Sequence, residues 1–269
     1  MKSLFLTAAM CVLPLSAATA QTCSKQSPAH TVALLELYTS EGCSSCPPAD
    51  KFVGGVHRAL SIDQVVPLAL HVDYWDYIGW KDGFAKREFT ERQRWLSNAG
   101  GSHTVYTPEM FVAGQELRNW SGGLPATVKR INERPAQADI GIALGKLAGN
   151  SLAVEVSATM TKNALHNAAQ NGGQSQSAPP RGKLFVALYE NGLTSAVKAG
   201  ENGGATLKHD YVVREWIGPV ALGGNGKAQL SRTLTVPPGA VGGNLGVAAF
   251  IEGDKGEVLQ ALALPLCGA

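Results

Sequence analysis

Two cysteines with two residues between them, Cys43 and Cys46, form the group in this sequence best suited to chemistry. Such a dithiol can cycle between two thiols and a disulfide, and the thiolate is the attacking species in that exchange. Cys43 comes first and is expected to be the more exposed of the two, so we assign it as the nucleophile. Cys46 is then the resolving thiol. The motif therefore predicts a redox-active pair.

The segments on either side of the cysteines predict where the pair stands in the fold. The apolar run 32–38 predicts a strand, and the apolar residues after the cysteines recur at the spacing of one helix face. These residues are Ala49, Phe52, Val53, Val56 and Leu60. The pair is thus placed on a strand-to-helix turn, where unpaired N–H groups and the helix dipole stabilise an anion. In such a setting a thiol pKa of about 8.5 can fall to roughly 3.5–7.5.

Other kinds of site also use two cysteines at this spacing. A structural zinc site needs four ligands, and the sequence has no second pair of this kind. A permanent structural disulfide and a copper-binding dithiol with a nearby histidine both stay open. A strand, a turn that carries the cysteines and an amphipathic helix together favour a redox site.

A second apolar segment, 65–73, predicts a buried parallel strand. It carries His71 and Asp73 on one face, because side chains alternate along a strand. Ligands of open parallel sheets bind beyond the carboxyl ends of the strands, and an aromatic segment follows at this point. We therefore predict a substrate-binding rim beside the dithiol, with ordinary loop packing as the alternative. Its residues are Tyr74, Trp75 and Trp80.

Thr107 and Pro108 lead into a short apolar strand that ends in a glycine-containing turn at Gly114. Proline has no N–H to donate to a sheet, so it suits the start of a strand. Only roughly 5–6% of X–Pro bonds in folded proteins are cis, so this stretch by itself favours trans. The dithiol upstream makes Pro108 a candidate catalytic residue and Thr107 a candidate substrate-binding residue.

Glu36 lies within the first predicted strand, seven residues before Cys43. A buried carboxyl has a raised pKa and can accept or relay the proton of the resolving thiol Cys46. Glu36 is therefore also a candidate catalytic residue. The alternative is that it points to solvent or caps a neighbouring segment.

The chain resembles a known family in three segments: LELYTSEGCSSCPPAD, LHVDYWDYIGW and YTPEMFVAG. They are similar to secreted bacterial thioredoxin-like proteins catalogued as a domain of unknown function. The likeness covers most of the mature chain and is strongest over 34–114. It implies a thioredoxin fold in which Cys43 and Cys46 are the redox pair and Pro108 is a cis-proline, beside which an incoming peptide pairs.

The sequence departs from ordinary thioredoxins in two ways. Ser44 and Ser45 stand between the cysteines in place of Gly-Pro, so the redox potential cannot be carried over. A long aromatic and helical insertion also separates the second strand from Pro108. The resemblance implies no particular substrate.

From about Asp139 onward the pattern changes to short apolar or alternating runs separated by turn residues. This pattern indicates an antiparallel sandwich, with residues 163–181 as a flexible loop inside it. The predicted fold is therefore an α/β thioredoxin-like domain with a helical insertion (21–136), followed by an all-β antiparallel sandwich-like domain (137–269).

One cluster of charged residues falls on a predicted strand of the second part. We interpret it as cross-strand pairs on the surface, with an anion cradle or a docking surface as the alternative. Its members are His209, Asp210, Arg214 and Glu215.

Residues 1–20 predict a cleavable signal peptide, with a positive start at Lys2, an apolar stretch and a cleavage site after Ala20. The mature protein is thus expected in the periplasm or outside the cell, and no later segment is long enough to span a bilayer. Export permits disulfides, so Cys23 and Cys267 are predicted to pair, or else to be two free thiols in the tails. Charged residues are 16% of the chain and form no basic cluster, which argues against nucleic-acid binding.

The leading hypothesis is an exported thiol–disulfide oxidoreductase that acts on protein or small-molecule thiols and disulfides and uses no cofactor or metal. A second hypothesis is a copper-binding or copper-delivery protein that uses Cys43 and Cys46, with His71 or His103 as a further ligand. A third is a non-catalytic binding module in which the two cysteines form a permanent staple. The sequence does not address the oligomeric state.

Overall fold

The computed structural model describes residues 23–162, 164 and 182–268. The predicted signal peptide (1–20) and the predicted loop (163–181, apart from residue 164) lie outside the described residues. Among the residues that are described, no helix is both long and apolar enough to cross a membrane.

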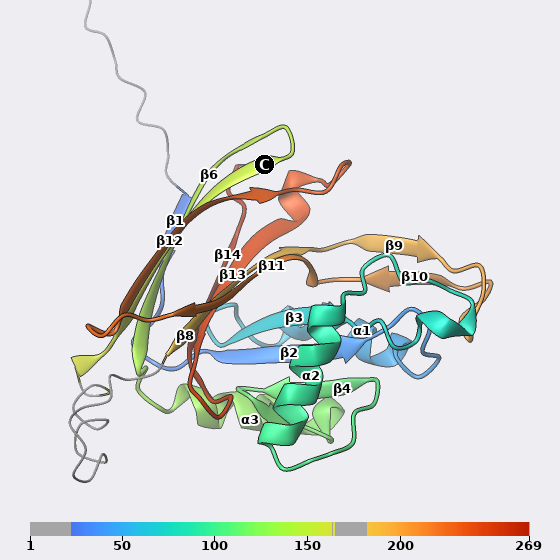
Figure 1. Cartoon of the computed structure of the whole chain (residues 1–269), viewed down its shortest axis with the longest axis horizontal. Coiled ribbons are helices and arrows are strands. Elements are labelled where there is room, and N and C mark those ends of the chain that lie inside the picture. Colours follow the sequence, from blue (N-terminus) through green and yellow to red (C-terminus); the bar gives the residue numbers. More distant parts are fainter. Residues whose placement is uncertain (1–22, 163, 165–181, 269) are drawn as a thin grey trace, which may run out of the picture.

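Eight strands form one mixed sheet that contains segments from both halves of the chain (Figure 1). β2 lies parallel to β3 and antiparallel to β4. In spatial order the strands are β14 (Val258–Pro265), β13 (Leu245–Glu252), β8 (Lys183–Glu190), β11 (Val212–Ala221), β3 (Val65–His71), β2 (Ala33–Thr39), β4 (Glu109–Val112) and β5 (Gln115–Glu116).

Two smaller sheets complete the β-structure. A four-stranded antiparallel sheet is ordered β1 (Cys23–Gln26), β6 (Ala138–Ala148), β7 (Ser151–Met160) and β12 (Lys227–Thr235). A separate hairpin consists of β9 (Leu193–Ala196) and β10 (Thr206–His209). This hairpin extends beyond the large sheet and lies beside the first helix (Figure 1).

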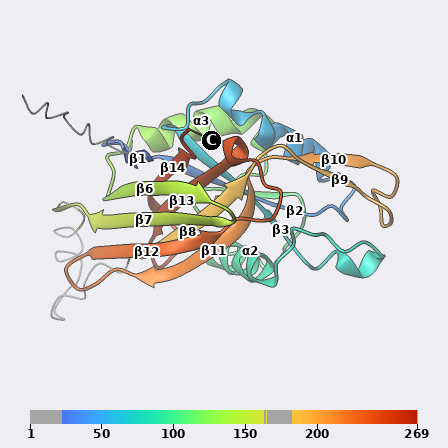
Figure 2. The same cartoon turned by 90° about the horizontal axis from the view of Figure 1, so that it is seen from above.

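Three α-helices pack against the end of the large sheet that contains β2 and β3. They are α1 (Pro47–Gly54), α2 (Arg87–Ala99) and α3 (Trp120–Asn132). Figure 2 shows α2 on one side of this part of the sheet and α1 with α3 on the other. Short 3-10 turns follow at η1 (Val56–Arg58), η2 (Asp76–Ile78) and η3 (Gly242–Asn244).

Side-chain alternation explains how the two larger sheets pack on each other. In β7 the apolar residues, such as Val154 and Val156, are buried, while the polar residues between them are exposed. β13 is buried along its whole length because both of its faces are covered. Val247 faces the four-stranded sheet, whereas Phe250 joins the core of β2 and β3.

The predicted fold class is therefore wrong. The described residues are mainly strands, fourteen of them against three α-helices, and they do not form a thioredoxin-like α/β domain with a helical insertion followed by a sandwich. Strands from the second half instead extend the sheet of β2 and β3, and β1 from the start of the chain pairs with β6. A strand edge exposes unpaired N–H and C=O groups; here the Ala69 N–H donates to the Tyr211 carbonyl at 2.8 Å. Alternation in a sequence predicts a strand but not its distant partner.

A buried cation fixes α2 to the large sheet. Arg92 lies on the apolar face of α2 and is only 9% exposed. Its Nε donates to Glu36 Oε1 at 2.6 Å and its Nη2 to Glu252 Oε2 at 2.7 Å, so the ion pairs join α2 to β2 and β13. The guanidinium also lies 5.0 Å from the ring centroid of Phe185. Paired in this way, the charge can be buried.

A disulfide joins Cys23, the first residue of β1, to Cys267, just beyond β14, as the sequence predicts. Their Cα atoms are 5.6 Å apart and their sequence separation is 244 residues. The bond closes a covalent loop that contains nearly all of the described residues. A loop of this length is expected to stabilise the protein by restricting the unfolded state.

We expect Arg92→Met to lower the free energy of unfolding by about 3–5 kcal/mol, because it leaves Glu36 and Glu252 buried without a cation. Arg87→Met on the same helix is the matched control, since Arg87 and Glu91 form an exposed pair that is worth at most about 1 kcal/mol. Urea unfolding of both variants measures the difference. Equal losses for the two variants would contradict the role assigned to Arg92.

Replacing both Cys23 and Cys267 by alanine is expected to cost about 2–5 kcal/mol of stability, because the unfolded chain regains the freedom that the bond removes. Urea unfolding without reductant measures this loss. Cys267→Ala alone should give a similar loss, since it removes the same bond. Peptide mapping of the oxidised wild-type protein that found both thiols free would refute the pairing.

Candidate functional site

The two cysteines of the motif lie between the end of β2 and the start of α1, as the sequence predicts. They form a disulfide with their Cα atoms 5.4 Å apart. Cys46 is the N-cap of α1, and its carbonyl accepts hydrogen bonds from the N–H groups of Ala49 and Asp50 at 2.9 and 3.1 Å. Pro47 begins the helix, where a missing N–H costs nothing. The sulfur atoms therefore lie at the positive end of the helix dipole.

Pro108 lies next to the dithiol because β4 pairs with β2. Tyr38 is opposite Glu109, so the residues just before β4 reach the turn that follows β2. The Thr107–Pro108 bond is cis, unlike the trans form that the isolated stretch favours. Ser45 Oγ is 3.3 Å from both the Thr107 carbonyl and Cys43 Sγ, and it thereby links the two segments.

Both cysteines are fully buried, with an exposed fraction of 0% for each, so the expected exposure of Cys43 is wrong. The loop at the tip of the β9–β10 hairpin supplies part of the cover. Asn202 Nδ2 donates to the carbonyls of Glu41 and Cys43 at 2.8 and 3.0 Å. Glu201 accepts hydrogen bonds from the N–H and hydroxyl of Ser44, and these bonds lower the pKa of the Glu201 carboxyl. Ser44 itself is exposed, so its contact with Glu201 lies at the surface.

The predicted aromatic rim is brought to the site, but its members have different partners. Trp75 Nε1 donates to Thr107 Oγ1 at 2.7 Å and so supports the loop that carries Pro108. Trp80 Nε1 donates to Glu41 Oε2 at 2.7 Å, and Trp80 also packs near Gly200 of the hairpin loop. Tyr74 is half-buried, and burial raises its pKa to about 12.

Glu36 lies on β2 but is engaged elsewhere. Besides Arg92, it accepts a hydrogen bond from the Tyr38 hydroxyl at 3.1 Å. Among the described residues it has no hydrogen bond or ion pair with Cys43 or Cys46. The structure therefore does not join Glu36 to the dithiol, and its role in proton transfer stays a prediction without a supporting contact.

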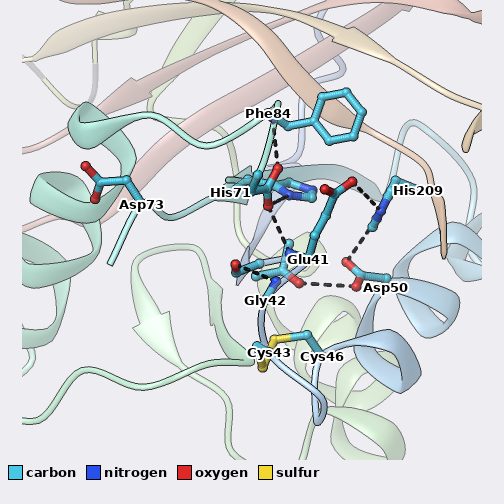
Figure 3. Close-up of polar contacts among 12 residues, drawn as sticks. Glu41, Gly42, Cys43, Cys46, Asp50, His71, Asp73, Phe84 and His209 are labelled. Carbon is cyan, nitrogen blue, oxygen red and sulfur yellow. Dashed lines mark hydrogen bonds and ion pairs between the residues drawn. A yellow bond between two sulfur atoms is a disulfide. The ribbon is translucent and has the colours of Figure 1, made fainter. Parts of the chain in front are cut away.

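A buried cluster of titratable side chains lies directly behind the dithiol (Figure 3). His71 Nδ1 is 2.7 Å from Asp82 Oδ2, and the rings of His71 and His209 are edge to face with centroids 5.0 Å apart. His209 lies between two carboxylates, with Nε2 at 3.5 Å from Glu41 Oε1 and Nδ1 at 4.0 Å from Asp50 Oδ1. The five residues come from separate segments of the chain that the fold brings together.

Burial and charge act on these groups in opposite directions. Burial by itself would lower the pKa of His71, but the carboxylates of Asp82, Asp50 and Glu41 raise it, and the net pKa lies above the usual value. Burial would raise the pKa of Asp82, yet the charge and hydrogen bond of His71 bring it below its usual value. Burial dominates at Asp50 and raises its pKa.

Sequence reasoning located only part of this cluster. His71 was expected to share a face with Asp73, but the Asp73 carboxylate instead accepts a hydrogen bond from Thr90 at 2.6 Å and lies away from the cluster (Figure 3). His209 was interpreted as one of a set of surface pairs, and this is wrong because it is buried on β10. The sequence did contain one signal for Asp50. It directly follows Ala49, which belongs to the apolar face predicted for the helix, and both residues are buried in α1.

The remaining members of the predicted charged cluster are dispersed. Arg214, on β11, pairs with Glu190 at 2.9 Å, as a cross-strand pair should. Glu215 Oε2 accepts a hydrogen bond from the Thr235 N–H at 2.6 Å, and Asp210 accepts one from the Gly192 N–H at 2.8 Å. These contacts are structural.

Within the part of the chain that the structure describes, neither histidine proposed as a copper ligand is grouped with the cysteines. His71 bonds Asp82, and His103 is exposed with its Nδ1 3.2 Å from Asn98 Oδ1. In the described parts of the chain, the one group of residues spaced to hold a metal is Asp50, His71 and His209, which includes neither cysteine. No observation therefore favours a copper site at the dithiol.

Two solved structures are similar to this one. Protein AGR_C_4864 from Agrobacterium tumefaciens is 22% identical with a TM-score of 0.56, and the match covers 89% of this chain and 96% of that one. HBP35 of Porphyromonas gingivalis is 17% identical with a TM-score of 0.64, and the match covers 90% of this chain and 77% of that one. At these identities the likeness shows the fold alone.

A comparison with curated proteins finds no match. A family model described as "Protein of unknown function (DUF1223)" matches residues 34–252. The match confirms the part of the resemblance that pointed to a family of unknown function. The chain therefore belongs to the DUF1223 family.

Proposed function

We propose that the protein is an exported thiol–disulfide oxidoreductase whose reacting pair is Cys43 and Cys46. The observation that supports this most is the location of their disulfide at the N-terminus of α1, beside the loop of Thr107 and Pro108. A thiolate at this point is stabilised by the helix, which is how reactive cysteines are activated. The two disulfides are compatible with an oxidising compartment.

The proposed reaction transfers two electrons through a mixed disulfide. In the reduced protein, the Cys43 thiolate attacks one sulfur of a partner disulfide, an S–S bond forms, and the other partner sulfur leaves as a thiolate that takes up a proton. The Cys46 thiolate then attacks Cys43 Sγ and releases the second partner thiol. The protein ends as the disulfide and the partner as a dithiol, and the reverse sequence oxidises a partner dithiol.

Ser45 supports the charge on Cys43 in this mechanism. Its hydroxyl has one proton and lies 3.3 Å from both the Thr107 carbonyl and Cys43 Sγ. In the disulfide form the hydroxyl donates this proton to the Thr107 carbonyl oxygen. After reduction the same hydroxyl can turn to the Cys43 thiolate, where a hydrogen bond to a charged acceptor is stronger.

Substrate access requires movement, because both sulfur atoms are buried. The hairpin loop is the part of the cover that can open, since it is held to the dithiol turn by Glu201 and Asn202 at exposed or half-exposed positions. Thr107 and the three aromatic residues of the rim would then position the partner. Those residues are Tyr74, Trp75 and Trp80.

The reduction potential of Cys43–Cys46 tests the proposal. We expect a value between about −270 and −120 mV, the range of known exchange catalysts. Equilibration with glutathione buffers, alkylation and peptide mapping measure it and separate this pair from Cys23–Cys267. A potential below about −300 mV would identify a permanent staple and contradict the proposal.

The two single-cysteine variants provide the matched control. Cys46→Ala should accumulate a mixed disulfide at Cys43 when mixed with a partner disulfide, because the resolving thiol is missing. Cys43→Ala should accumulate little, since it lacks the nucleophile. Equal yields from the two variants would contradict the assigned roles.

Asn202→Ala is expected to speed reduction of Cys43–Cys46 by dithiothreitol roughly tenfold. It removes two hydrogen bonds that hold the hairpin loop over the dithiol, each worth about 0.5–1.5 kcal/mol. Lys198→Ala is the control, because Lys198 is exposed in the same loop and makes no ion pair or hydrogen bond in the described structure. If both variants react at the wild-type rate, the hairpin loop does not limit access.

A further inference from the structure

The buried cluster behind the dithiol contains a set of metal-ligand atoms with no assigned role. One carboxylate oxygen of Asp50 and one ring nitrogen each of His71 and His209 lie within 4.8 Å of one another, and all three residues are buried. They come from α1, β3 and β10 respectively. The fold therefore converges three ligands from separate elements on one point.

Several nitrogen atoms in this cluster lack hydrogen-bond partners. Within the described residues, His71 Nε2 and both ring nitrogens of His209 are buried and make no hydrogen bond. Buried polar groups in proteins are nearly always satisfied. One nitrogen of each ring is consequently best explained by a bound ligand that accepts its lone pair.

A carboxylate faces each ring: one is hydrogen-bonded to His71, and the other lies close to His209. Asp82 accepts from His71 Nδ1–H at 2.7 Å, which leaves Nε2 with its lone pair free. Asp82 is itself held by the N–H groups of Glu41 and Phe84 at 2.9 and 2.8 Å. Glu41 Oε1 lies 3.5 Å from His209 Nε2, which leaves Nδ1 facing Asp50. A carboxylate behind each ligating histidine is the usual outer layer of a metal site.

The negative charge of the carboxylates in this cluster also favours a bound cation. Asp50, Asp82 and Glu41 are three buried carboxylates, and in the described chain no lysine or arginine pairs with any of them. When both histidines are neutral, as metal binding requires, the three carboxylates leave this region negatively charged. A divalent ion would neutralise most of that charge.

We propose that Asp50, His71 and His209 bind a divalent transition-metal ion, with Zn²⁺ as the ion that fits best. Two imidazoles and one carboxylate are a ligand set that Zn²⁺ uses, whereas Ca²⁺ and Mg²⁺ prefer oxygen ligands alone. The absence of a cysteine from the ligand set distinguishes this site from a Cu(I) dithiol. Tetrahedral Zn²⁺ needs ligand atoms roughly 3.3–3.5 Å apart, so their separations contract by at most about 1.5 Å on binding.

The bound ion would fasten the cover of the dithiol. His209 lies on the hairpin whose loop covers Cys43, and Asp50 lies four residues after Cys46 on α1. A metal that joins both to His71 on β3 holds the hairpin closed. This inference goes beyond redox chemistry and does not depend on it, because metal binding is measured directly.

The test uses the full mature chain, stripped with a chelator and titrated with Zn²⁺ by calorimetry, with metal content checked by mass spectrometry. We expect one equivalent to bind and, at about 100 times the dissociation constant, to raise the Tm by about 5–10 °C. His209→Gln and Asp50→Asn should abolish both effects. His103→Gln, at an exposed histidine, should bind as the wild type does, and so should the double variant Cys43→Ala, Cys46→Ala.

Glu41→Gln keeps the test decisive if a ligand variant fails to fold. It leaves the three ligands in place and should weaken Zn²⁺ binding about 10–100-fold. Wild-type protein that binds no Zn²⁺ would overturn the proposal. So would binding that survives His209→Gln, or binding that is lost in the double cysteine variant, since the latter assigns the metal to the dithiol.

Discussion

The register of β2 with its two neighbours positions every group of the candidate site. Opposite Tyr38 is Glu109, and this brings Pro108 to the turn that carries the cysteines. Opposite Thr39 is His71, and this places the imidazole behind the same turn. A slip of one residue would exchange the faces of the strand and separate these groups. Because β2 is buried on both faces along its whole length, such a slip would also move the Glu36 carboxylate to the opposite face and away from Arg92.

The turn between β2 and α1 therefore has two different environments. Toward the Thr107 loop it presents a disulfide, a hydroxyl and the start of a helix, which suit sulfur chemistry. On the other side it presents carboxylates and imidazoles that are shielded from water. The hairpin of β9 and β10 contributes to both, since Asn202 binds the Cys43 carbonyl and His209 belongs to the buried cluster. Any motion of this hairpin must change both environments together.

Local periodicity was enough to predict the elements next to the dithiol but not their distant partners. The apolar runs predicted β2 and β3, and the spacing of Ala49 and Val53 predicted α1, because these patterns lie within one element. The contact of Ala69 with Tyr211, and the burial of Cys43 under Asn202, join segments more than 140 residues apart. Short-range patterns contain no information about such contacts. This is why the fold class was wrong and His209 was placed on the surface.

The bond between Cys23 and Cys267 makes the chain a covalent ring from the first described residue almost to the last. A protease that cuts one exposed turn, such as the one at Gly224 and Asn225, therefore opens the ring but separates no fragments until the bond is reduced. In an oxidising environment, resistance to proteolysis thus follows from the Cys23–Cys267 crosslink as well as from the free energy of folding.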